Sequence, residues 1–332
     1  MERLGIIGGG AWGTALALTA RRAGRTVTLW AHEAEVVAAV NRDHENRFFL
    51  PGISLDPAIH ATTDLAEAAA VDAILLVPPA QHLRQVLNAL AHHVVPGTPA
   101  VICAKGIEER SGALMSEVAA AALPQAKLAL LSGPTFAVEV ARGLPTAVTL
   151  ASRDGALAER LVAAIGTRSF RPYVSDDVPG AEIGGAVKNV LAIACGIITG
   201  RGLGDNARAA LITRGLAEMV RLALAKGGRA ETLMGLSGLG DLVLTCTGLQ
   251  SRNHSLGVAL GEGRALGDIL AQRRSVAEGV SSAAAATALA RRLGVDMPIT
   301  AAVDAILHHG AGIDAAIAGL LSRPFKSETA AP

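Results

Sequence analysis

The chain contains little lysine: only five of its 30 cationic residues are lysine, and the others are arginine. One of the five, Lys188, is the only charged residue in the apolar stretch from Gly184 to Gly200. Arginine stays protonated in proteins, whereas a lysine that is partly removed from water can act as an acid or a base. This pattern makes Lys188 a candidate for proton transfer.

Aromatic residues are also scarce, at 2% of 332 residues, and the formal net charge is only +1 with the basic residues scattered. A nucleic-acid-binding surface needs a basic patch and often aromatic stacking platforms, so we expect no nucleic-acid partner. The sequence lacks an uncharged apolar run of 18 residues, the length that a membrane-spanning helix requires. We therefore expect no integral membrane segment.

Cysteine is rare as well, with only Cys103, Cys195 and Cys246 in the chain. Their number and spacing suit neither a disulfide framework nor a zinc site, and we expect no metal. The N-terminus lacks the basic and apolar pattern of a signal peptide. A reducing cytoplasm is the expected location.

The two halves of the chain differ in periodicity. In the first half, short apolar runs alternate with alanine-rich helical segments, which is typical of buried parallel strands in βαβ units. From about residue 180 onward helical periodicity dominates, as in Leu211–Lys226 and Val280–Leu293. We predict an α/β domain with a mostly parallel sheet over residues 1–179, an all-α domain over 180–325 and a disordered tail over 326–332. The predicted strands are Leu4–Ile7, Thr26–Trp30, Ile59–Thr62, Ala73–Val77, Val101–Ala104, Leu128–Leu131 and Ala147–Ala151.

The segment Gly8-Gly9-Gly10-Ala11-Trp12-Gly13 matches the G-x-G-x-x-G pattern of dinucleotide-binding turns. It follows the first predicted strand and opens a helix, which is the context that the pattern requires. Gly8 would form the tight turn, Gly10 would let the backbone approach the pyrophosphate, and Gly13 would allow close helix packing. A glycine-rich turn without a ligand is the alternative. The context favours a Rossmann-type domain that binds a nicotinamide dinucleotide.

The end of the second predicted strand bears on the choice between NAD(H) and NADP(H). An acidic residue usually binds the ribose there in NAD-selective sites, but the sequence is Trp30-Ala31-His32-Glu33. Arg25 and His32 could tolerate a 2′-phosphate, whereas Glu33 and Glu35 could oppose it. Solvated loop charges without such a role are the alternative. We expect use of both cofactors, with NADP(H) preferred.

Polar groups follow two of the predicted strands. Lys105 follows Val101–Ala104, and Gly133 and Thr135 follow Leu128–Leu131. Ligands of open α/β sheets bind outside the carboxyl ends of the strands, so we expect all three residues at this crevice. A cation at Lys105 suits an anionic substrate or the cofactor, although an ordinary loop lysine is the alternative.

A second polar group lies in the helical half. Asp241 is surrounded in sequence by apolar residues, and Ser251-Arg252-Asn253 follows it with hydroxyl, guanidinium and amide donors. Such donors together at a helix start suit a phosphate group, which arginine binds in bidentate fashion. The alternative is that Asp241 and Ser251 are helix caps and that Arg252 is a surface residue.

Taken together and in order, these segments closely resemble the bacterial NAD(P)-dependent glycerol-3-phosphate dehydrogenase family, from Gly8 to about Pro298. The resemblance implies reversible reduction of dihydroxyacetone phosphate to sn-glycerol 3-phosphate, a phospholipid precursor. The motifs that carry it are Ile-Gly-Gly-Gly-Ala-Trp-Gly-Thr-Ala-Leu, Leu-Ser-Gly-Pro-Thr-Phe-Ala, Gly-Gly-Ala-Val-Lys-Asn-Val, Gly-Leu-Gly-Asp-Leu-Val-Leu-Thr-Cys-Thr and Gln-Ser-Arg-Asn.

The resemblance also implies roles for individual residues. It makes Lys188 the proton acceptor, with Asp241 beside it. The implied substrate contacts are Lys105, Gly133, Thr135, Lys188, Asp241, Ser251, Arg252 and Asn253. Beside the glycine-turn residues Gly8, Gly10, Ala11 and Gly13, the implied cofactor contacts are Trp12, His32, Lys105, Ala137, Arg252, Val276 and Glu278.

The sequence departs from the family pattern at two places. Ala11 stands where many members have serine or threonine, and Pro78-Pro79 replaces proline followed by a small polar residue. Two other classes of protein compete with this interpretation: a β-hydroxyacid dehydrogenase, and a non-catalytic NADP-sensing protein. The retained Lys188, Asp241 and Arg252 argue against the second. The oligomeric state is left open, with a homodimer as one candidate.

Overall fold

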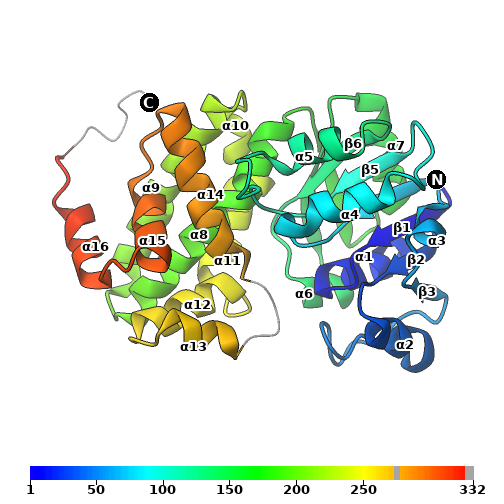
Figure 1. The fold of residues 1–332 in the computed structure, drawn as a ribbon, viewed down its shortest axis with the longest axis horizontal. Coiled ribbons are helices and arrows are strands. Elements are labelled where there is room, and N and C mark those ends of the chain that lie inside the picture. Colours follow the sequence, from blue (N-terminus) through cyan, green and yellow to red (C-terminus); the bar gives the residue numbers. More distant parts are fainter. Residues whose placement is uncertain (273–276, 326–332) are drawn as a thin grey trace. The chain divides into compact units, whose positions relative to one another are not determined.

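The computed structural model describes residues 1–272 and 277–325 and contains an eight-stranded sheet. The strand order is β3-β2-β1-β4-β5-β6-β7-β8 (Figure 1). Every predicted strand is present, which confirms an α/β fold with a mostly parallel sheet. The strands are β1 (Arg3–Ile7), β2 (Thr26–Trp30), β3 (Ile59–Thr62), β4 (Ala73–Leu76), β5 (Pro99–Ile102), β6 (Lys127–Ser132), β7 (Thr146–Ala151) and β8 (Phe170–Ser175).

The sheet departs from the prediction at its far edge. β7 pairs with β6 in antiparallel fashion, so the expectation of a parallel strand there is wrong for this pairing. The connection between them holds only α6 (Ala137–Ala141), a five-residue helix, which is shorter than the helix of a parallel crossover. β8 was not predicted because, of its residues, only Phe170 is buried. Pro172 in this strand is compatible with its place at the edge of the sheet.

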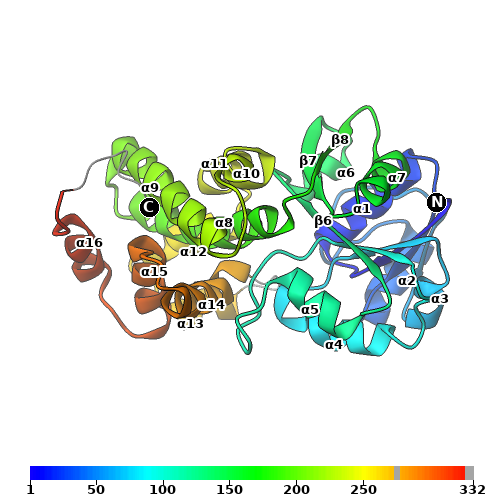
Figure 2. The ribbon, with the colours of Figure 1, turned by 90° about the horizontal axis from the view of Figure 1, so that it is seen from above.

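Helices cover both faces of this sheet. Leu4 and Ile6 of β1 join a buried cluster with α1 and α7, whereas Ile7 joins a second cluster with α4 and α5. Successive side chains of a strand point to opposite faces, so each apolar strand contributes to both clusters. Figure 2 shows α1 and α7 on one side and α4 and α5 on the other. The helices of this part are α1 (Ala11–Arg22), α2 (Ala34–Asp43), α3 (Leu65–Ala69), η1 (Ala80–His82), α4 (Leu83–Leu90), α5 (Met115–Ala122), α6 and α7 (Gly155–Ile165).

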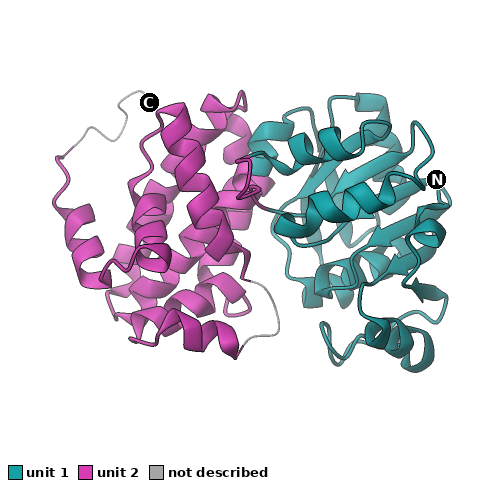
Figure 3. Cartoon of the chain, in the orientation of Figure 1, with its two compact units in different colours: residues 1–105, 113–182 teal, residues 106–112, 183–332 magenta. Residues whose placement is uncertain are grey.

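The chain divides into two compact units (Figure 3): residues 1–105 with 113–182, and residues 106–112 with 183 onward. The segment Gly106–Gly112 is bound to the second unit, where the Arg292 guanidinium donates to the carbonyls of Ser111 and Gly112 at 3.1 and 3.3 Å. Nothing in the composition of this segment indicates that it packs with helices. The predicted tail, residues 326–332, lies outside the described residues.

In the residues that the structure describes, the second unit consists of helices. α8 begins at the end of the first unit and continues into the second, where Figure 1 shows the later helices grouped around it. The elements are α8 (Val178–Gly200), α9 (Gly204–Ala225), α10 (Ala230–Leu233), the π-helical turn η2 (Leu236–Gly240), α11 (Asp241–Thr247), α12 (Arg252–Gly261), α13 (Leu266–Ala271), α14 (Glu278–Leu293), α15 (Pro298–His308) and α16 (Ile313–Leu321).

The apolar character of α8 is explained by its burial. By length and composition alone this helix could cross a membrane, but 89% of its apolar 18-residue segment is buried inside the protein. Lys188 lies in the middle of α8 and is only 6% exposed. From Gly184 to its end at Gly200, the helix therefore carries Lys188 as its one charge through the core of the second unit.

Glycines allow α12 to pack closely against α8. A Cβ atom at Gly196 of α8 would lie 2.8 Å from the Cα atom of Gly257 in α12. One turn further along both helices, a Cβ atom at Gly200 would lie 3.0 Å from the Cα atom of Gly261. Both distances are shorter than a carbon–carbon contact permits. The close crossing fixes the first residues of α12 relative to Lys188.

Candidate active site

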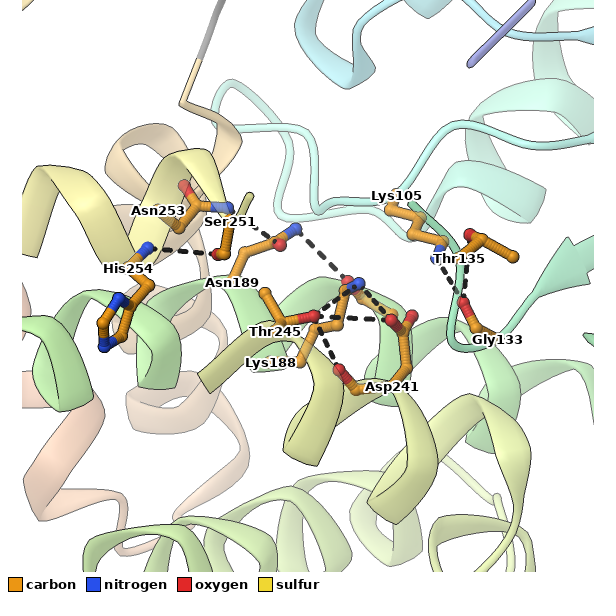
Figure 4. A network of polar contacts seen from close by, with 11 residues as sticks. Lys105, Gly133, Thr135, Lys188, Asn189, Asp241, Thr245, Ser251, Asn253 and His254 are labelled. Carbon is orange, nitrogen blue, oxygen red and sulfur yellow. Dashed lines mark hydrogen bonds and ion pairs between the residues drawn. The ribbon is translucent and has the colours of Figure 1, made fainter. Parts of the chain in front are cut away.

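Lys188 and Asp241 form a buried ion pair in the second unit (Figure 4). Asp241 is the first residue of α11 and is 0% exposed. The Lys188 Nζ donates to Oδ1 of Asp241 and, at 3.1 Å, to Oγ1 of Thr245. A buried charge without a partner costs several kcal/mol, about 3–5 when one member of a pair is removed. Each member of this pair therefore depends on the other.

The close approach of η2 to α8 brings Asp241 to Lys188. Gly184 lies one helical turn before Lys188, and a Cβ atom there would collide with the carbonyl oxygen of Ser237 in η2. The π-helical turn leads directly into Asp241 at the start of α11. Because glycine permits this contact, the carboxylate reaches α8 at the level of Lys188. Single-turn π-helices are frequent at functional sites.

Thr245 also contacts Lys188 and was not predicted from the sequence. Its hydroxyl donates to the carbonyl of Asp241 at 2.6 Å, one helical turn earlier. The oxygen then accepts the hydrogen bond from Lys188, so the hydroxyl is oriented from both sides. A spacing of four residues from Asp241 on a predicted helix is the signal that could have identified it.

Asn189 was also not predicted, although it follows Lys188 directly. Its Oδ1 accepts a hydrogen bond of 2.9 Å from Nδ2 of Asn253, the second residue of α12. The Oδ1 of Asn253 accepts a 3.0 Å bond from the backbone N–H of Gly279 in α14. Asn253 therefore connects α8, α12 and α14, and these bonds use its carbonyl oxygen and one amide hydrogen.

Ser251, Arg252 and Asn253 lie together at the start of α12. Ser251 is the N-cap, and its Oγ accepts a 3.1 Å bond from the backbone N–H of His254. The helix-cap interpretation is therefore correct for Ser251, whereas the carboxylate of Asp241 pairs with Lys188. Arg252 is exposed. A helix N-terminus beside a guanidinium is favourable for an anion such as phosphate.

In the first unit, Lys105, Gly133 and Thr135 lie together, as their positions after β5 and β6 predict (Figure 4). The Lys105 Nζ donates to the carbonyl of Gly133 at 3.0 Å, and the Thr135 hydroxyl lies 3.2 Å from the same oxygen. Gly133 has a φ of 154°, and a Cβ atom there would lie 2.9 Å from the Cα atom of Val148. Ala137 begins α6 immediately beyond.

The glycine turn between β1 and α1 has the geometry that a dinucleotide pyrophosphate requires. Gly8 has a φ of 131°, and a Cβ atom at Gly13 would collide with the carbonyl oxygen of Gly8. Around a Cβ atom at Gly10, by contrast, no atom of the described residues lies within 4 Å, apart from Gly10 itself and its chain neighbours. Gly10 caps α1 without a side-chain hydrogen bond, so the helix N-terminus is available to an anion. Beside the turn, the indole N–H of Trp12 is buried without a hydrogen-bond partner among the described residues.

The remaining predicted cofactor residues belong to different units. His32 is exposed just before α2, Glu278 is the first residue of α14, and Val276 lies outside the described residues. In the part of the chain that the structure describes, no group of three or more His, Cys, Asp or Glu side chains could hold a metal ion. The residues present fit a dinucleotide at the glycine turn.

Cys246 lies on α11 with Asp241 and Thr245, and its surroundings disfavour the thiolate form. A hydrogen bond with Cys195 and burial both raise the pKa of the Cys246 thiol well above its ordinary value. The reactive form of cysteine is the thiolate, which such surroundings disfavour. The side chain is fully buried, with 0% exposure.

Comparisons with known proteins agree over nearly the whole chain. The profile of the NAD-dependent glycerol-3-phosphate dehydrogenase N-terminus matches residues 3–158, and that of the C-terminus matches residues 177–318. Glycerol-3-phosphate dehydrogenase (NAD(P)+) from Rhodospirillum rubrum is 64% identical over 330 residues, which cover 99% of this chain and 94% of the relative. The corresponding enzyme from Parvibaculum lavamentivorans is 61% identical and covers 99% and 98% of the two chains. The crystal structure of glycerol-3-phosphate dehydrogenase from Coxiella burnetii superimposes with a TM-score of 0.94, at 41% identity, over 97% of this chain and 99% of that one.

Replacing Thr245 by valine should destabilise the protein by about 1–3 kcal/mol, because a buried donor of Lys188 loses its acceptor. Thr245→Ser, which keeps the hydroxyl, should recover most of this loss. Thr247→Val is the matched control, since the exposed Thr247 makes the same bond to the carbonyl of residue i−4, Val243, at 2.7 Å. Urea unfolding of the three variants measures the difference. Equal losses for Thr245→Val and Thr247→Val would contradict the assigned contact.

Stability should depend on pH through His254. Burial lowers the pKa of His254 from its ordinary value of 6.5, and the charge of Arg208 acts in the same direction. As the pH falls below 6.5, His254 becomes protonated in the unfolded chain before it does so in the folded protein. The free energy of unfolding therefore falls. Denaturant unfolding between pH 7.5 and about 5 should show a shallower decline for His254→Gln than for the wild type. The exposed His93→Gln is the control, and a decline in His254→Gln as steep as in the wild type would refute the assignment.

Proposed function

The chain belongs to the NAD-dependent glycerol-3-phosphate dehydrogenase family, whose members are NAD(P)+-dependent oxidoreductases, and we propose that it reduces dihydroxyacetone phosphate to sn-glycerol 3-phosphate. In this direction it would supply the backbone of glycerophospholipids in the cytoplasm. The observation that carries the proposal is the buried pair of Lys188 and Asp241. A buried ammonium held by a carboxylate and a hydroxyl is a proton source with a fixed position.

We assign the proton transfer to Lys188. When bound, the nicotinamide supplies the hydride that C2 of dihydroxyacetone phosphate receives. The Lys188 ammonium donates a proton to the oxygen at C2 as negative charge develops there, and in the reverse direction the free amine accepts it. One hydride and one proton thus convert the carbonyl into the alcohol. Asp241 and Thr245 orient the nitrogen and stabilise its charged form.

The phosphate of the substrate has a proposed binding site at the start of α12. There the N-terminus of a ten-residue helix, capped by Ser251, lies beside the Arg252 guanidinium. Asn253 is held by Asn189 and Gly279, so its position relative to Lys188 is fixed. Lys105, Gly133 and Thr135 are proposed as the substrate contacts from the first unit. Binding energy from a phosphate remote from C2 can orient the carbonyl for the reaction.

The proposed cofactor contacts lie at the glycine turn, at Trp12, His32, Lys105, Ala137, Arg252, Val276 and Glu278. No carboxylate occupies the end of β2, where Ala31 is buried and the exposed His32 follows. The N-terminus of α2 has no side-chain cap, so its N–H groups can attract a 2′-phosphate, whereas Glu33 at the N-cap and Glu35 in the first turn oppose it. We therefore propose that both cofactors are used and that NADP(H) is preferred.

The proposal is tested by the oxidation of NADPH and of NADH with dihydroxyacetone phosphate, in parallel with an unphosphorylated acid semialdehyde. Turnover should require the phosphorylated substrate, and NADPH should be the better reductant. Preferential turnover of the semialdehyde would favour a β-hydroxyacid dehydrogenase instead. Nucleotide binding without turnover of either substrate would indicate a non-catalytic protein.

Arg252→Ala should raise the KM for dihydroxyacetone phosphate by about 10- to 100-fold, since a charge-assisted hydrogen bond contributes about 1.5–3 kcal/mol. Arg264→Ala removes an exposed arginine that bonds Gln272 at 2.7 Å and serves as the control. Its KM should stay within about twofold of the wild type. An unchanged KM in Arg252→Ala would remove Arg252 from the phosphate site.

A further inference from the structure

Asn46 connects the loop after α2 to the glycine turn. It is 0% exposed, and its Nδ2 donates to the carbonyl of Gly9 and to the hydroxyl of Thr14, both at 2.8 Å. Its Oδ1 accepts a 3.2 Å bond from the backbone N–H of Phe49. Both amide hydrogens and the carbonyl oxygen of this side chain therefore form hydrogen bonds. The two bonds from the amide hydrogens go to the glycine turn and the start of α1.

Thr14 extends the connection to a second peptide group of the turn. Its hydroxyl donates to the carbonyl of Gly10 at 2.9 Å. Because the Thr14 oxygen accepts from Asn46, its single hydrogen is directed to Gly10. Asn46 thus holds the Gly9 carbonyl directly. Through the Thr14 hydroxyl it also supports the Gly10 carbonyl, which accepts a 3.0 Å bond from the backbone N–H of Thr14 as well. Consecutive hydrogen bonds of this kind strengthen one another.

Fixing these two carbonyls also fixes two N–H groups. In a planar trans peptide the C=O and N–H point in opposite directions. With the Gly9 and Gly10 carbonyls turned toward Asn46 and Thr14, the N–H groups of Gly10 and Ala11 point away from them. Glycine peptides flip easily because no Cβ atom restricts them. A flipped Gly9–Gly10 peptide would present an oxygen, rather than an N–H, to an anion.

The loop that carries Asn46 is well anchored. The backbone N–H of Leu50 donates to the carbonyl of Asn46, and that of Leu55 donates to the carbonyl of His44, both at 2.8 Å. Leu50, Ile53 and Leu55 are buried in the same cluster as β1 and α1. The loop therefore gives Asn46 a fixed position from which to hold the turn.

We propose that Asn46 is a positioning residue for dinucleotide binding, which orients the Gly10 and Ala11 N–H groups toward the pyrophosphate. This proposal rests on the proposed function. Ala11 has no side-chain hydroxyl to offer a phosphate, so in this chain the backbone N–H groups of the turn carry that interaction. Asn46 acts through the turn and contacts neither substrate nor reacting atoms.

The test compares Asn46→Ala with Asn41→Ala. Asn41 lies in α2 and makes two hydrogen bonds to the backbone of Ala61 in β3, at 2.9 and 2.8 Å. Both variants lose side-chain hydrogen bonds within the same unit, but only Asn46 bonds to the turn. The Kd for NADPH and for NADH is measured by calorimetric titration of the full chain, together with the thermal midpoint, kcat and KM.

Asn46→Ala should weaken NADPH binding by about tenfold or more, with kcat at saturating NADPH within about twofold of the wild type. Asn41→Ala should lower the thermal midpoint but leave the Kd within about twofold. Thr14→Val should weaken NADPH binding in the same way, and Thr14→Ser, which keeps the hydroxyl, should not. If Asn46→Ala does not fold, the comparison of Thr14→Val with Thr14→Ser tests the proposal.

Wild-type affinity for NADPH in Asn46→Ala or in Thr14→Val would overturn the proposal, as would an equal loss of affinity in Asn41→Ala. A wild type that binds neither NADPH nor NADH would contradict the proposed function itself, and with it the positioning role. A wild type that binds NADPH, with variants that bind it equally well, would contradict only the role of Asn46.

Discussion

The ion pair between Lys188 and Asp241 is the interaction on which the proposed chemistry depends. A lysine in the middle of a buried helix is tolerated only because a carboxylate and a hydroxyl surround its nitrogen. Asp241 reaches it because Gly184 leaves room for the π-helical turn. The first residues of α12 are fixed to the same helix through Gly196, Gly257 and the contact between Asn189 and Asn253. The core packing of the second unit thus holds the proposed proton donor, Lys188, and the proposed phosphate site at the start of α12 close to the same helix, α8.

In the first unit, too, contacts within the fold fix the positions of the proposed site residues. Parallel strands end at one edge of the sheet, where Lys105 and Thr135 meet at the carbonyl of Gly133. The glycine turn offers backbone N–H groups, and Asn46 holds its carbonyls from a separate, buried loop. In each unit a group proposed to contact a ligand is held by a polar residue that is not: Asn189 holds Asn253, and Asn46 holds the backbone of the glycine turn. Such supporting contacts keep a site within the tolerance that catalysis requires.

Much of this arrangement could be predicted from the sequence. Apolar runs identify seven of the eight strands, and the turn from Gly8 to Gly13 follows from its context. Lys188 is conspicuous as the only charge in an apolar stretch. The strand Phe170–Ser175 was not predicted because this edge strand has little apolar patterning. The antiparallel direction of β7 was not predicted because it depends on the short connection through α6. Asn189 and Asn46 were not predicted because each is a single polar residue whose contacts arise only in the folded structure. Thr245 could have been identified by its spacing of four residues from Asp241.

A single-turnover measurement of hydride transfer tests the proposed proton exchange between Lys188 and the oxygen on C2. The double variant Lys188→Met/Asp241→Asn removes both charges together, which avoids an unpaired carboxylate in the core. With NADPH and dihydroxyacetone phosphate bound to excess enzyme, the oxidation rate should fall by about 10²–10⁴ relative to the wild type. The Kd for NADPH should stay within about threefold, because the glycine turn is untouched. A rate within a few-fold of the wild type, in a folded variant that binds both ligands, would contradict the account.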